Sequence, residues 1–521
     1  MIPHAALLAT VIPGIVGIII YAIRSRLRAR KKVGETEWAE SREEGTGYWA
    51  GIIATIAASV SILMIVSMGR DLMESWAMNR TELTFSYPWI RPIDLDFGFL
   101  VDVVSLPIGL IVAVVSMLSC LYSIKYMEKD RAQGSYYANL LLFMTGMIGV
   151  IFAANLIQFY LFWELMLIPS YLLIANWGVS ENRLSIGFKY FIFTHVGALS
   201  MLLGILSIYA YTGTFNLLEL PSKATAIPSH MVIVIFVLLL IGFLVKMAAF
   251  PVHTWLPDAH SEAPTPISAM LSGVMIKCGA YGMARILLMT FGPTVIQTSD
   301  YLTILGVVTM AYGGLMALAQ TDIKRLLAYS SISQMGYILF GLGAVSTTSS
   351  LGIMGGLFHI INHAVCKSLL FMCAGVIIHQ TGIRDIRKLG GLVGKMPATG
   401  IACMIGAFSL LGTPPLNGFW SEWMIFGGGL ASGKGLITIF GVLSTVITAG
   451  YYLWFAWRVF LGPTPKNLND VKEAPFTLLI PIIILTILSI LLGVLPGLVL
   501  EYITPAADYL SSFLSGVSQA G

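Results

Sequence analysis

The feature that most constrains this chain is the repeated occurrence of apolar runs about 20 residues long. A run of that length crosses the hydrocarbon core of a bilayer as a helix. Only 11% of the 521 residues are charged, against about 25% in soluble proteins. We therefore predict an all-α polytopic membrane protein with about 14 transmembrane helices. The predicted spans are roughly 5–23, 49–69, 99–120, 137–153, 155–177, 186–211, 231–252, 265–291, 302–320, 325–346, 352–378, 397–428, 435–457 and 475–498.

The distribution of lysine and arginine predicts the orientation. Loops after odd-numbered spans carry 21 of these residues, loops after even-numbered spans carry 5, and the termini carry none. By the positive-inside rule the first set of loops is cytoplasmic, so both termini lie on the outer side of a prokaryotic cell membrane. The first run follows no basic residue and lacks a small-residue cleavage site, which indicates a retained helix and not a signal peptide.

The first cytoplasmic loop, 24–48, is basic and then acidic. We interpret it as a solvated loop that contacts anionic lipid headgroups. A surface that docks a partner protein is the alternative.

Five charged residues lie near the middle of predicted spans. Each would cost about 3 kcal/mol if it were unpaired, a total close to the stability margin of a whole domain, about 5–15 kcal/mol. We therefore expect them to pair with one another or to be hydrated, and to form a polar axis through the protein. Arg285, near the end of its span, is expected to extend to water. The five are Glu164, Lys246, Lys277, Lys367 and Glu422.

Two histidines join this set. The segment HIINHAVCK places His359, His363 and Lys367 at positions i, i+4 and i+8, on one face of a helix. A histidine titrates near neutral pH and can relay protons. The span 325–346 adds hydroxyl and amide groups that suit bound water, at Tyr329, Ser330, Ser333, Gln334 and Tyr337.

Two spans contain helix breakers beside a buried charge. Pro251 follows Lys246, and Pro414 and Pro415 precede Glu422. Proline removes a backbone donor and opens a helix, and such gaps survive at membrane depth only where they line protein or water. A pair of interrupted helices in corresponding positions is typical of transporters built from internal repeats.

Several kinds of cofactor site find no support. The five cysteines form no CxxC pair, and neither a GxGxxG nor a Walker motif is present, so we predict no iron–sulfur, zinc or nucleotide site in this chain and no role in nucleic-acid binding. We interpret the cysteines as small buried apolar side chains. The segment HTWLPDAHSE could supply metal ligands, but capping and hydrogen bonding to the freed backbone are preferred for its side chains: His253, Asp258, His260 and Glu262.

Several motifs resemble one family of membrane proteins. These motifs are FWELMLIPSYLLI, VKMAAFPVHTWLPDAHSEAPTPISAMLSGVMIKCGAYG, DIKRLLAYSSISQMGY, NHAVCKSLLF and GTPPLNGFWSEW. They resemble the antiporter-like subunits of complex I, of energy-converting hydrogenases and of multisubunit Mrp Na⁺/H⁺ antiporters, over about residues 95–460. The resemblance implies two inverted five-helix repeats with interrupted seventh and twelfth helices. The implied division is an N-terminal segment over residues 1–130, repeats at 131–291 and 302–460, and a final helix with a short tail in 475–521.

The resemblance also implies roles for the buried residues. Glu164 and Lys246 resemble an ion pair that governs proton affinity, and Lys277 resembles a lysine that hands protons towards the centre. His359 and His363 resemble connecting histidines, Lys367 a lysine of the eleventh helix, and Glu422 the terminal group of the twelfth. A glutamate at this last position is typical of the M-type (chain 4) subunit, whereas NHAVCKSLLF is closer to hydrogenase-type and Mrp-type subunits.

Our functional hypothesis is a subunit that moves H⁺ or Na⁺ within a complex I-like oxidoreductase. Redox centres, namely iron–sulfur clusters with nickel–iron or flavin groups, are then expected in peripheral partner subunits. The other expected partners are further membrane-arm subunits, including antiporter-like ones, and lipids. The alternatives are an Mrp-type antiporter subunit without redox chemistry and a scaffold whose polar axis moves no ions.

Overall fold

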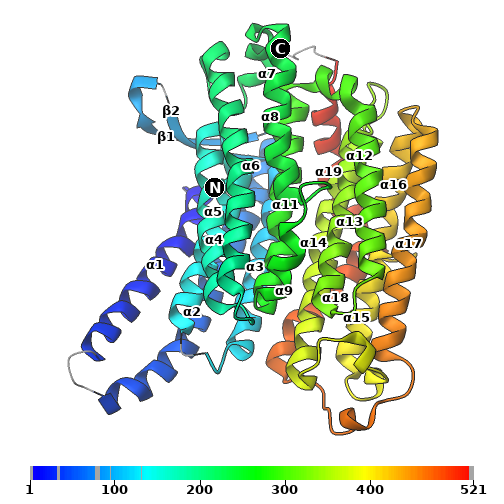
Figure 1. The fold of residues 1–521 in the computed structure, drawn as a ribbon. Coiled ribbons are helices and arrows are strands. Elements are labelled where there is room, and N and C mark those ends of the chain that lie inside the picture. The colour runs from blue at the N-terminus through cyan, green and yellow to red at the C-terminus, as the bar shows by residue number, and fades with distance from the viewer. Residues whose placement is uncertain (1–3, 32–35, 77–81, 94, 131, 516–521) are drawn as a thin grey trace.

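Long helices that lie roughly side by side dominate the structure, a computed structural model (Figure 1). It describes residues 4–31, 36–76, 82–93, 95–130 and 132–515. Within these residues, 12 helices are long and apolar enough to cross a membrane. The predicted class, a helical multi-pass membrane protein, is confirmed.

The N-terminal segment contains three long helices and a hairpin. Helices α1 and α2 extend into the predicted loop 24–48 from both sides; residues 32–35 and the side chains of 26–46 lie outside the described residues. The elements are α1 (Ala5–Lys31), α2 (Thr36–Trp76), β1 (Glu82–Ile90), η1 (Arg91–Ile93), β2 (Leu95–Asp102) and α3 (Ser105–Tyr126).

The hairpin corrects the predicted start of the third span. We expected a helix from residue 99, but β1 and β2 pair antiparallel, from Glu82 opposite Asp102 to Ile90 opposite Leu95. The Asp102 carboxylate then accepts hydrogen bonds from the backbone N–H groups of Val104 and Ser105, at 3.1 and 2.9 Å. These bonds satisfy donors that the first turn of α3 leaves free.

Two consecutive sets of five helical segments follow; two of these segments, Ile323–Gly343 and the interrupted segment 397–431, are not among the 12 helices counted above. Because five is an odd number, the second set begins on the opposite side of the bundle from the first. The first set comprises α4 (Gln133–Phe152), α5 (Leu156–Trp177), α6 (Arg183–Thr212), α8 (Ser229–Met247) with α9 (Trp255–Glu262), and a crossing formed by α10 (Thr265–Met270), η3 (Leu271–Met275), α11 (Ile276–Gly282) and η4 (Met283–Leu288). The loop between α6 and α8 holds α7 (Leu220–Lys223) and η2 (Ala224–Ala226).

The second set ends before the C-terminal helices. It comprises α12 (Gly292–Leu318), α13 (Ile323–Gly343), α14 (Leu351–Thr381), α15 (Pro397–Leu410) with α16 (Asn417–Ala431), and α17 (Gly435–Phe460). Short turns η5 (Ile386–Lys388), η6 (Leu392–Gly394) and η7 (Lys466–Leu468) lie in the loops, and α18 (Phe476–Val494) and α19 (Gly497–Ser512) complete the chain.

Both predicted helix breaks are present. Residues 248–254 separate α8 from α9, and residues 411–416 separate α15 from α16. The backbone groups freed at the first break find partners: Trp255 Nε1 donates to the Val245 carbonyl at 3.0 Å, and Phe250 N–H donates to Thr309 Oγ1 at 3.3 Å. The first gap is therefore supported by hydrogen bonds that involve α9 and α12, as membrane depth requires.

Helix α19 was not predicted, since a short tail was expected after the last span. It is anchored by Ser350 Oγ, which donates to Asp508 at 2.6 Å, and it packs against α14.

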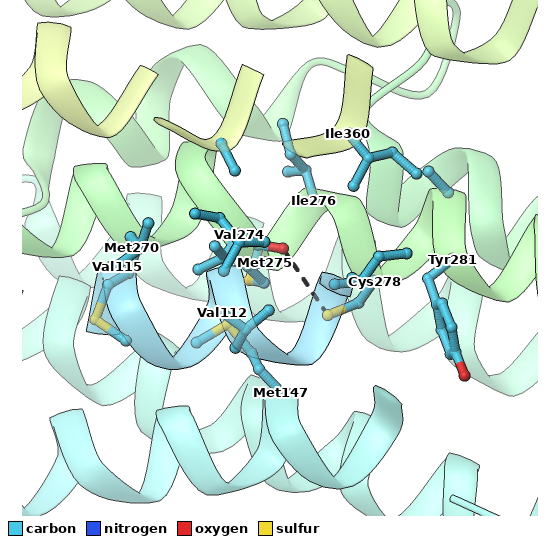
Figure 2. Packing of buried hydrophobic residues seen from close by; sticks show 14 of the residues in the cluster. Val112, Val115, Met147, Met270, Val274, Met275, Ile276, Cys278, Tyr281 and Ile360 are labelled. Carbon is cyan, nitrogen blue, oxygen red and sulfur yellow. Dashed lines mark hydrogen bonds between the residues drawn. The ribbon is translucent and has the colours of Figure 1, made fainter. Parts of the chain in front are cut away.

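The core surrounds the crossing formed by α10, η3, α11 and η4, which is 100% buried inside the structure. Figure 2 shows its residues Met270, Val274 and Ile276 packed among Val112 of α3, Met147 of α4 and Ile360 of α14. This crossing, which carries Lys277, is therefore shielded by protein on all sides. The five cysteines are free and buried, as predicted.

Candidate functional site

The candidate site is a set of ionisable side chains, most of them buried, on the interrupted helices and their neighbours. At its start, Glu164 of α5 lies with Oε2 3.2 Å from Nδ1 of His195 on α6. The His195 ring stacks on Phe191, with centroids 5.5 Å apart. The side chains of Glu164 and His195 are 19% and 35% exposed, so the pair faces the outside of this chain.

Lys246 lies at the end of α8, directly before the break. Its Nζ has no hydrogen-bond partner within the described part of the chain, and it lies 5.1 Å from the centroid of the Trp163 ring. The resemblance implied an ion pair with Glu164. The structure places Glu164 within electrostatic reach of Lys246, but the partner within 4 Å of Glu164 is His195.

Lys277 is buried in the fully enclosed crossing. Its ammonium group donates to the Ser272 carbonyl, which belongs to the π-helical turn η3. Ser272 Oγ is also 2.6 Å from Ser331 Oγ of α13. Single π-turns inside α-helices occur frequently at functional sites, and this one directs hydrogen-bonding groups of the first set toward the second.

The two histidines of α14 differ in their surroundings. His359 Nδ1 lies 2.9 Å from Ser421 Oγ of α16, and its Nε2 lies 2.7 Å from Gln334 Oε1 of α13. His363 stacks on His359 with ring centroids 6.1 Å apart. Neither nitrogen of His363 has a partner among the residues described, and Lys277, Lys367 and His359 lie within electrostatic reach of it.

Lys367, on the same helix, is held by neutral oxygens. Its Nζ donates to the Leu327 carbonyl at 3.0 Å, to Tyr452 Oη at 3.1 Å and to Ser330 Oγ. No carboxylate lies within 4 Å of this ammonium group in the described structure. At Lys367, carbonyl and hydroxyl oxygens therefore stand where pairing with a charge or hydration was expected.

Glu422 lies on α16, after the second break. It is buried, and its Oε1 has no hydrogen-bond partner within the residues that the structure describes. Gly412 in the break has φ +76°, and a Cβ added there would lie 2.6 Å from Glu422 Oε2. The carboxylate therefore lies directly against the backbone of the break that contains Pro414 and Pro415.

The side chains around the first break have structural partners. Pro251 lies within the break, and the His253 ring packs against Tyr312 with centroids 4.6 Å apart. Asp258 binds Lys189 at 2.7 Å and Arg325 at 3.0 Å, which ties α6, α9 and α13 together.

His260 and Glu262 complete that segment. His260 is buried and stacks on Phe371 with centroids 4.8 Å apart. Neither of its ring nitrogens has a hydrogen-bond partner among the described residues, so the predicted capping or hydrogen bonding is wrong for this side chain. Glu262 Oε2 accepts from Ser180 N–H at 2.8 Å. Within the described residues, no group of three or more His, Cys, Asp or Glu side chains is placed to hold a metal ion.

Arg285 does not extend to water, contrary to the prediction. It is buried and binds Asp102 at 2.6 Å, with side-chain exposures of 0% and 3%. Its Nε also donates to Tyr281 Oη at 3.1 Å. The carboxylate that attracts it comes from the unpredicted hairpin, which explains why the arginine turns inward.

Several polar residues of the site were not predicted. His195 has no spacing pattern with other polar residues. Asn362 and Asn417 exchange amide hydrogen bonds between α14 and α16, with Asn362 Nδ2 2.8 Å from the Asn417 carbonyl and Asn417 Nδ2 3.1 Å from Asn362 Oδ1. Asn362 Nδ2 also donates to Ser421 Oγ at 3.1 Å. Asn362 lies in the motif NHAVCK and Asn417 lies in PLNGFW. The sequence signal that could have identified them is a polar amide within a predicted membrane span.

The side chains of the site include acids, bases and hydroxyl groups that can exchange protons across both sets of helices. Such groups at membrane depth mark ion pathways. A multi-pass fold with two interrupted helices and this polar axis defines the class of ion-translocating membrane proteins.

Comparison with family models specifies the class. A model described as "NADH:quinone oxidoreductase/Mrp antiporter, TM" matches residues 153–448, and one described as "NADH-Ubiquinone oxidoreductase (complex I), chain 5 N-terminus" matches residues 89–137. The chain belongs to this NADH:quinone oxidoreductase/Mrp antiporter family of membrane subunits.

Individual relatives come from both branches of the family. The chain is 35% identical over 446 residues to F(420)H(2) dehydrogenase subunit M of Methanosarcina mazei, an alignment that covers 83% of this chain and 87% of the relative. It is 38% identical over 440 residues to a Na(+)/H(+) antiporter subunit of Alkalihalophilus pseudofirmus, covering 79% of this chain but only 54% of that longer protein.

Solved structures share the fold. A chain of the archaeal membrane-bound sulfane sulfur reductase superposes with a TM-score of 0.82 at 30% identity, covering 95% of this chain and 77% of that one. A chain of respiratory complex I from Thermus thermophilus superposes with a TM-score of 0.83 at 23% identity, covering 98% and 99%.

Proposed function

We propose that this chain is a proton- or sodium-translocating, antiporter-like subunit of a complex I-like membrane oxidoreductase. The observation that carries the proposal is the series of ionisable groups at membrane depth, from the partly exposed Glu164 in the first set of helices to the buried Glu422 in the second. Ionisable groups are expensive at membrane depth, and seven of them in one series favour an ion path over a passive scaffold. These residues are Glu164, Lys246, Lys277, His359, His363, Lys367 and Glu422.

The position of Glu164 supports a switch at the start of the path. A carboxylate that serves as counter-ion to a lysine favours the charged lysine, and withdrawal of that carboxylate favours proton release. Two groups that can carry positive charge interact with Glu164: His195, whose Nδ1 lies 3.2 Å from Oε2, and Lys246, which interacts with the carboxylate electrostatically without an ion-pair contact within 4 Å. In our proposal Glu164 moves between these partners, and Lys246 releases its proton when Glu164 pairs with His195.

The released proton then passes to Lys277, His363 and His359. His359 contacts Ser421, the residue before Glu422, and Glu422 controls release from the second set. The hydroxyl groups around Lys367 supply hydrogen-bonding positions for water along this route.

Exposure of the Glu164–His195 pair supports assembly with partner subunits. A charge open to lipid is costly, so we propose that a neighbouring membrane-arm subunit covers this face. Redox centres, with iron–sulfur clusters and nickel–iron or flavin groups, are proposed for peripheral subunits. The 35% identity over 87% of a dehydrogenase subunit supports redox drive, and an Mrp-type antiporter without redox chemistry is the alternative.

The test is purification of the intact complex from native membranes, followed by electron paramagnetic resonance and reconstitution into vesicles. We expect iron–sulfur signals and ion uptake coupled to electron transfer. A complex of membrane subunits without metal signals would favour the gradient-driven antiporter. Proton uptake that resists a sodium ionophore would identify H⁺ as the ion, and ²²Na⁺ uptake would identify Na⁺.

The Glu164→Gln variant tests the switch in the same vesicles. Electron transfer should continue while the number of ions moved per electron falls strongly. An unchanged number of ions per electron in Glu164→Gln and in Lys246→Met would instead indicate a scaffold with a static polar axis.

A further inference from the structure

An apolar cavity lies against α14, the helix that carries His359, His363 and Lys367. It has a volume of about 470 Å³ and lies among α2, α3, α18 and α19, with its inner wall on α14. Arg70 and Tyr502 are the polar side chains that line it; its other lining residues are apolar or glycine. Representative apolar residues are Leu110 of α3, Val365 of α14 and Leu488 of α18.

The cavity extends from the ends of the helices to the middle of the bundle. Arg70 lies six residues before the end of α2, beside the hairpin. Val365 lies 14 residues into α14 from Leu351, which is about 21 Å along a helix that rises 1.5 Å per residue. The hydrocarbon core of a bilayer is about 30 Å thick, so the cavity runs from headgroup level to about the bilayer centre.

The apolar lining of the cavity limits what can occupy it. An apolar cavity does not retain water. A hydrocarbon chain is narrow enough to follow its length and is supplied by the surrounding bilayer.

The mouth of the cavity presents one positive and one negative charge. Arg70 Nε is 3.1 Å from Glu74 Oε1, and the two side chains are 83% and 61% exposed. The planar guanidinium group suits a phosphate, to which it can donate two parallel hydrogen bonds. The neighbouring carboxylate suits an ammonium group.

We propose that this cavity is a specific binding site for a zwitterionic phospholipid that carries a primary amine. One acyl chain occupies the cavity, the phosphate binds Arg70, the ammonium group binds Glu74, and Tyr502 lies at the rim at headgroup level. This site lies outside the proposed ion path and does not depend on which ion is moved.

The site has a consequence for the proposed path. Ile361 and Val365 line the cavity and lie two residues from His359 and His363 on α14. Two residues correspond to about 200° around a helix, so an acyl chain would pack against the back of the helix that carries the histidines. It would keep that face dry and separate the path from the membrane surface.

Native mass spectrometry of the intact purified complex tests the proposal. The complex is incubated with phosphatidylethanolamine or phosphatidylglycerol and then stripped with mild detergent. We expect one retained phosphatidylethanolamine per copy of this chain. Retention should fall about tenfold or more in Arg70→Gln, as expected for the loss of a charge-assisted bond to phosphate.

Leu110→Trp tests the cavity itself, because the larger side chain fills it. Leu63→Trp on α2 is the matched control, since Leu63 is 64% exposed and does not line the cavity. We expect lipid loss in the first variant and retention in the second. Equal retention in Leu110→Trp and wild type, or no retained lipid in wild type, overturns the site. Equal retention of phosphatidylglycerol overturns the headgroup assignment, and the surface variant Arg70→Gln gives an answer even if Leu110→Trp fails to fold.

Discussion

Asp102 and Arg285 illustrate how much a single buried pair can contribute. Removal of one partner of a buried ion pair leaves an uncompensated charge and costs about 3–5 kcal/mol. We therefore expect Arg285→Met to lower the thermal stability of the purified chain substantially, because the buried Asp102 carboxylate loses its ion-pair partner. The double variant Arg285→Met/Asp102→Asn should recover most of the loss, since the amide oxygen still accepts the bonds that cap α3. A double variant as unstable as the single one would contradict this account.

Substitution of each histidine of α14 can distinguish a structural role from a role in proton transfer. His359→Leu should cost stability, because Ser421 and Gln334 lose buried partners, each at about 1–3 kcal/mol. His363→Leu should leave the unfolding temperature nearly unchanged, because His363 forms no hydrogen bond to the described residues. Both variants should reduce pumping, by about 10²-fold if proton transfer through the imidazole is obligatory. Normal pumping by His363→Leu would remove that histidine from the path.

At the scale of elements, the second helix break can be tested through its glycine. Gly412 and Gly433 both have φ +76°, but only at Gly412 would a Cβ collide with the Glu422 carboxylate; Gly433 has no atom within 4 Å. Each substitution by alanine should cost about 1–2 kcal/mol for the left-handed backbone. Gly412→Ala should also displace Glu422 and reduce the ions moved per electron, whereas Gly433→Ala should pump normally. Equal pumping by both variants would show that the position of Glu422 against the break is unimportant.

The elements that sequence reasoning missed have physical explanations. Strand β2 contains the continuous apolar run FGFLV, which periodicity cannot distinguish from the start of a buried helix. Helix α19 is only 16 residues long and carries Glu501 and Asp508, so no apolar run of spanning length marks it. The breaks could be predicted because proline acts locally, through a missing donor in its own helix.

At the scale of the whole molecule, pairing across the sequence was the hardest feature to predict. The charges near the middle of the spans were readable from the sequence, but neither the full set of buried charges nor their partners were. The structure also buries Asp102, Glu262, Arg285 and Lys324. Arg285 binds a residue 183 positions away, and Lys367 is solvated by groups from α13 and α17. Glu164 pairs with a histidine on the next helix that no motif singled out. Partners of this kind follow from packing, and the charge pattern alone specifies only that partners must exist.

The orientation of the whole molecule gives a final prediction, based on the two ends of α14. Lys388 and Thr347 are exposed in the loops after and before this helix. The lysine and arginine distribution predicts that the loop with Lys388 lies in the cytoplasm and that the loop with Thr347 lies outside. In right-side-out vesicles, a membrane-impermeant thiol reagent should label Thr347→Cys but not Lys388→Cys, and inside-out vesicles should reverse the result. Because all five native cysteines are buried, the unsubstituted protein should label weakly and serve as the control. Labelling of Lys388→Cys from the outside would show that the topology is the reverse of the proposed one. The path from Glu164 to Glu422 would then move its ion in the opposite direction across the membrane.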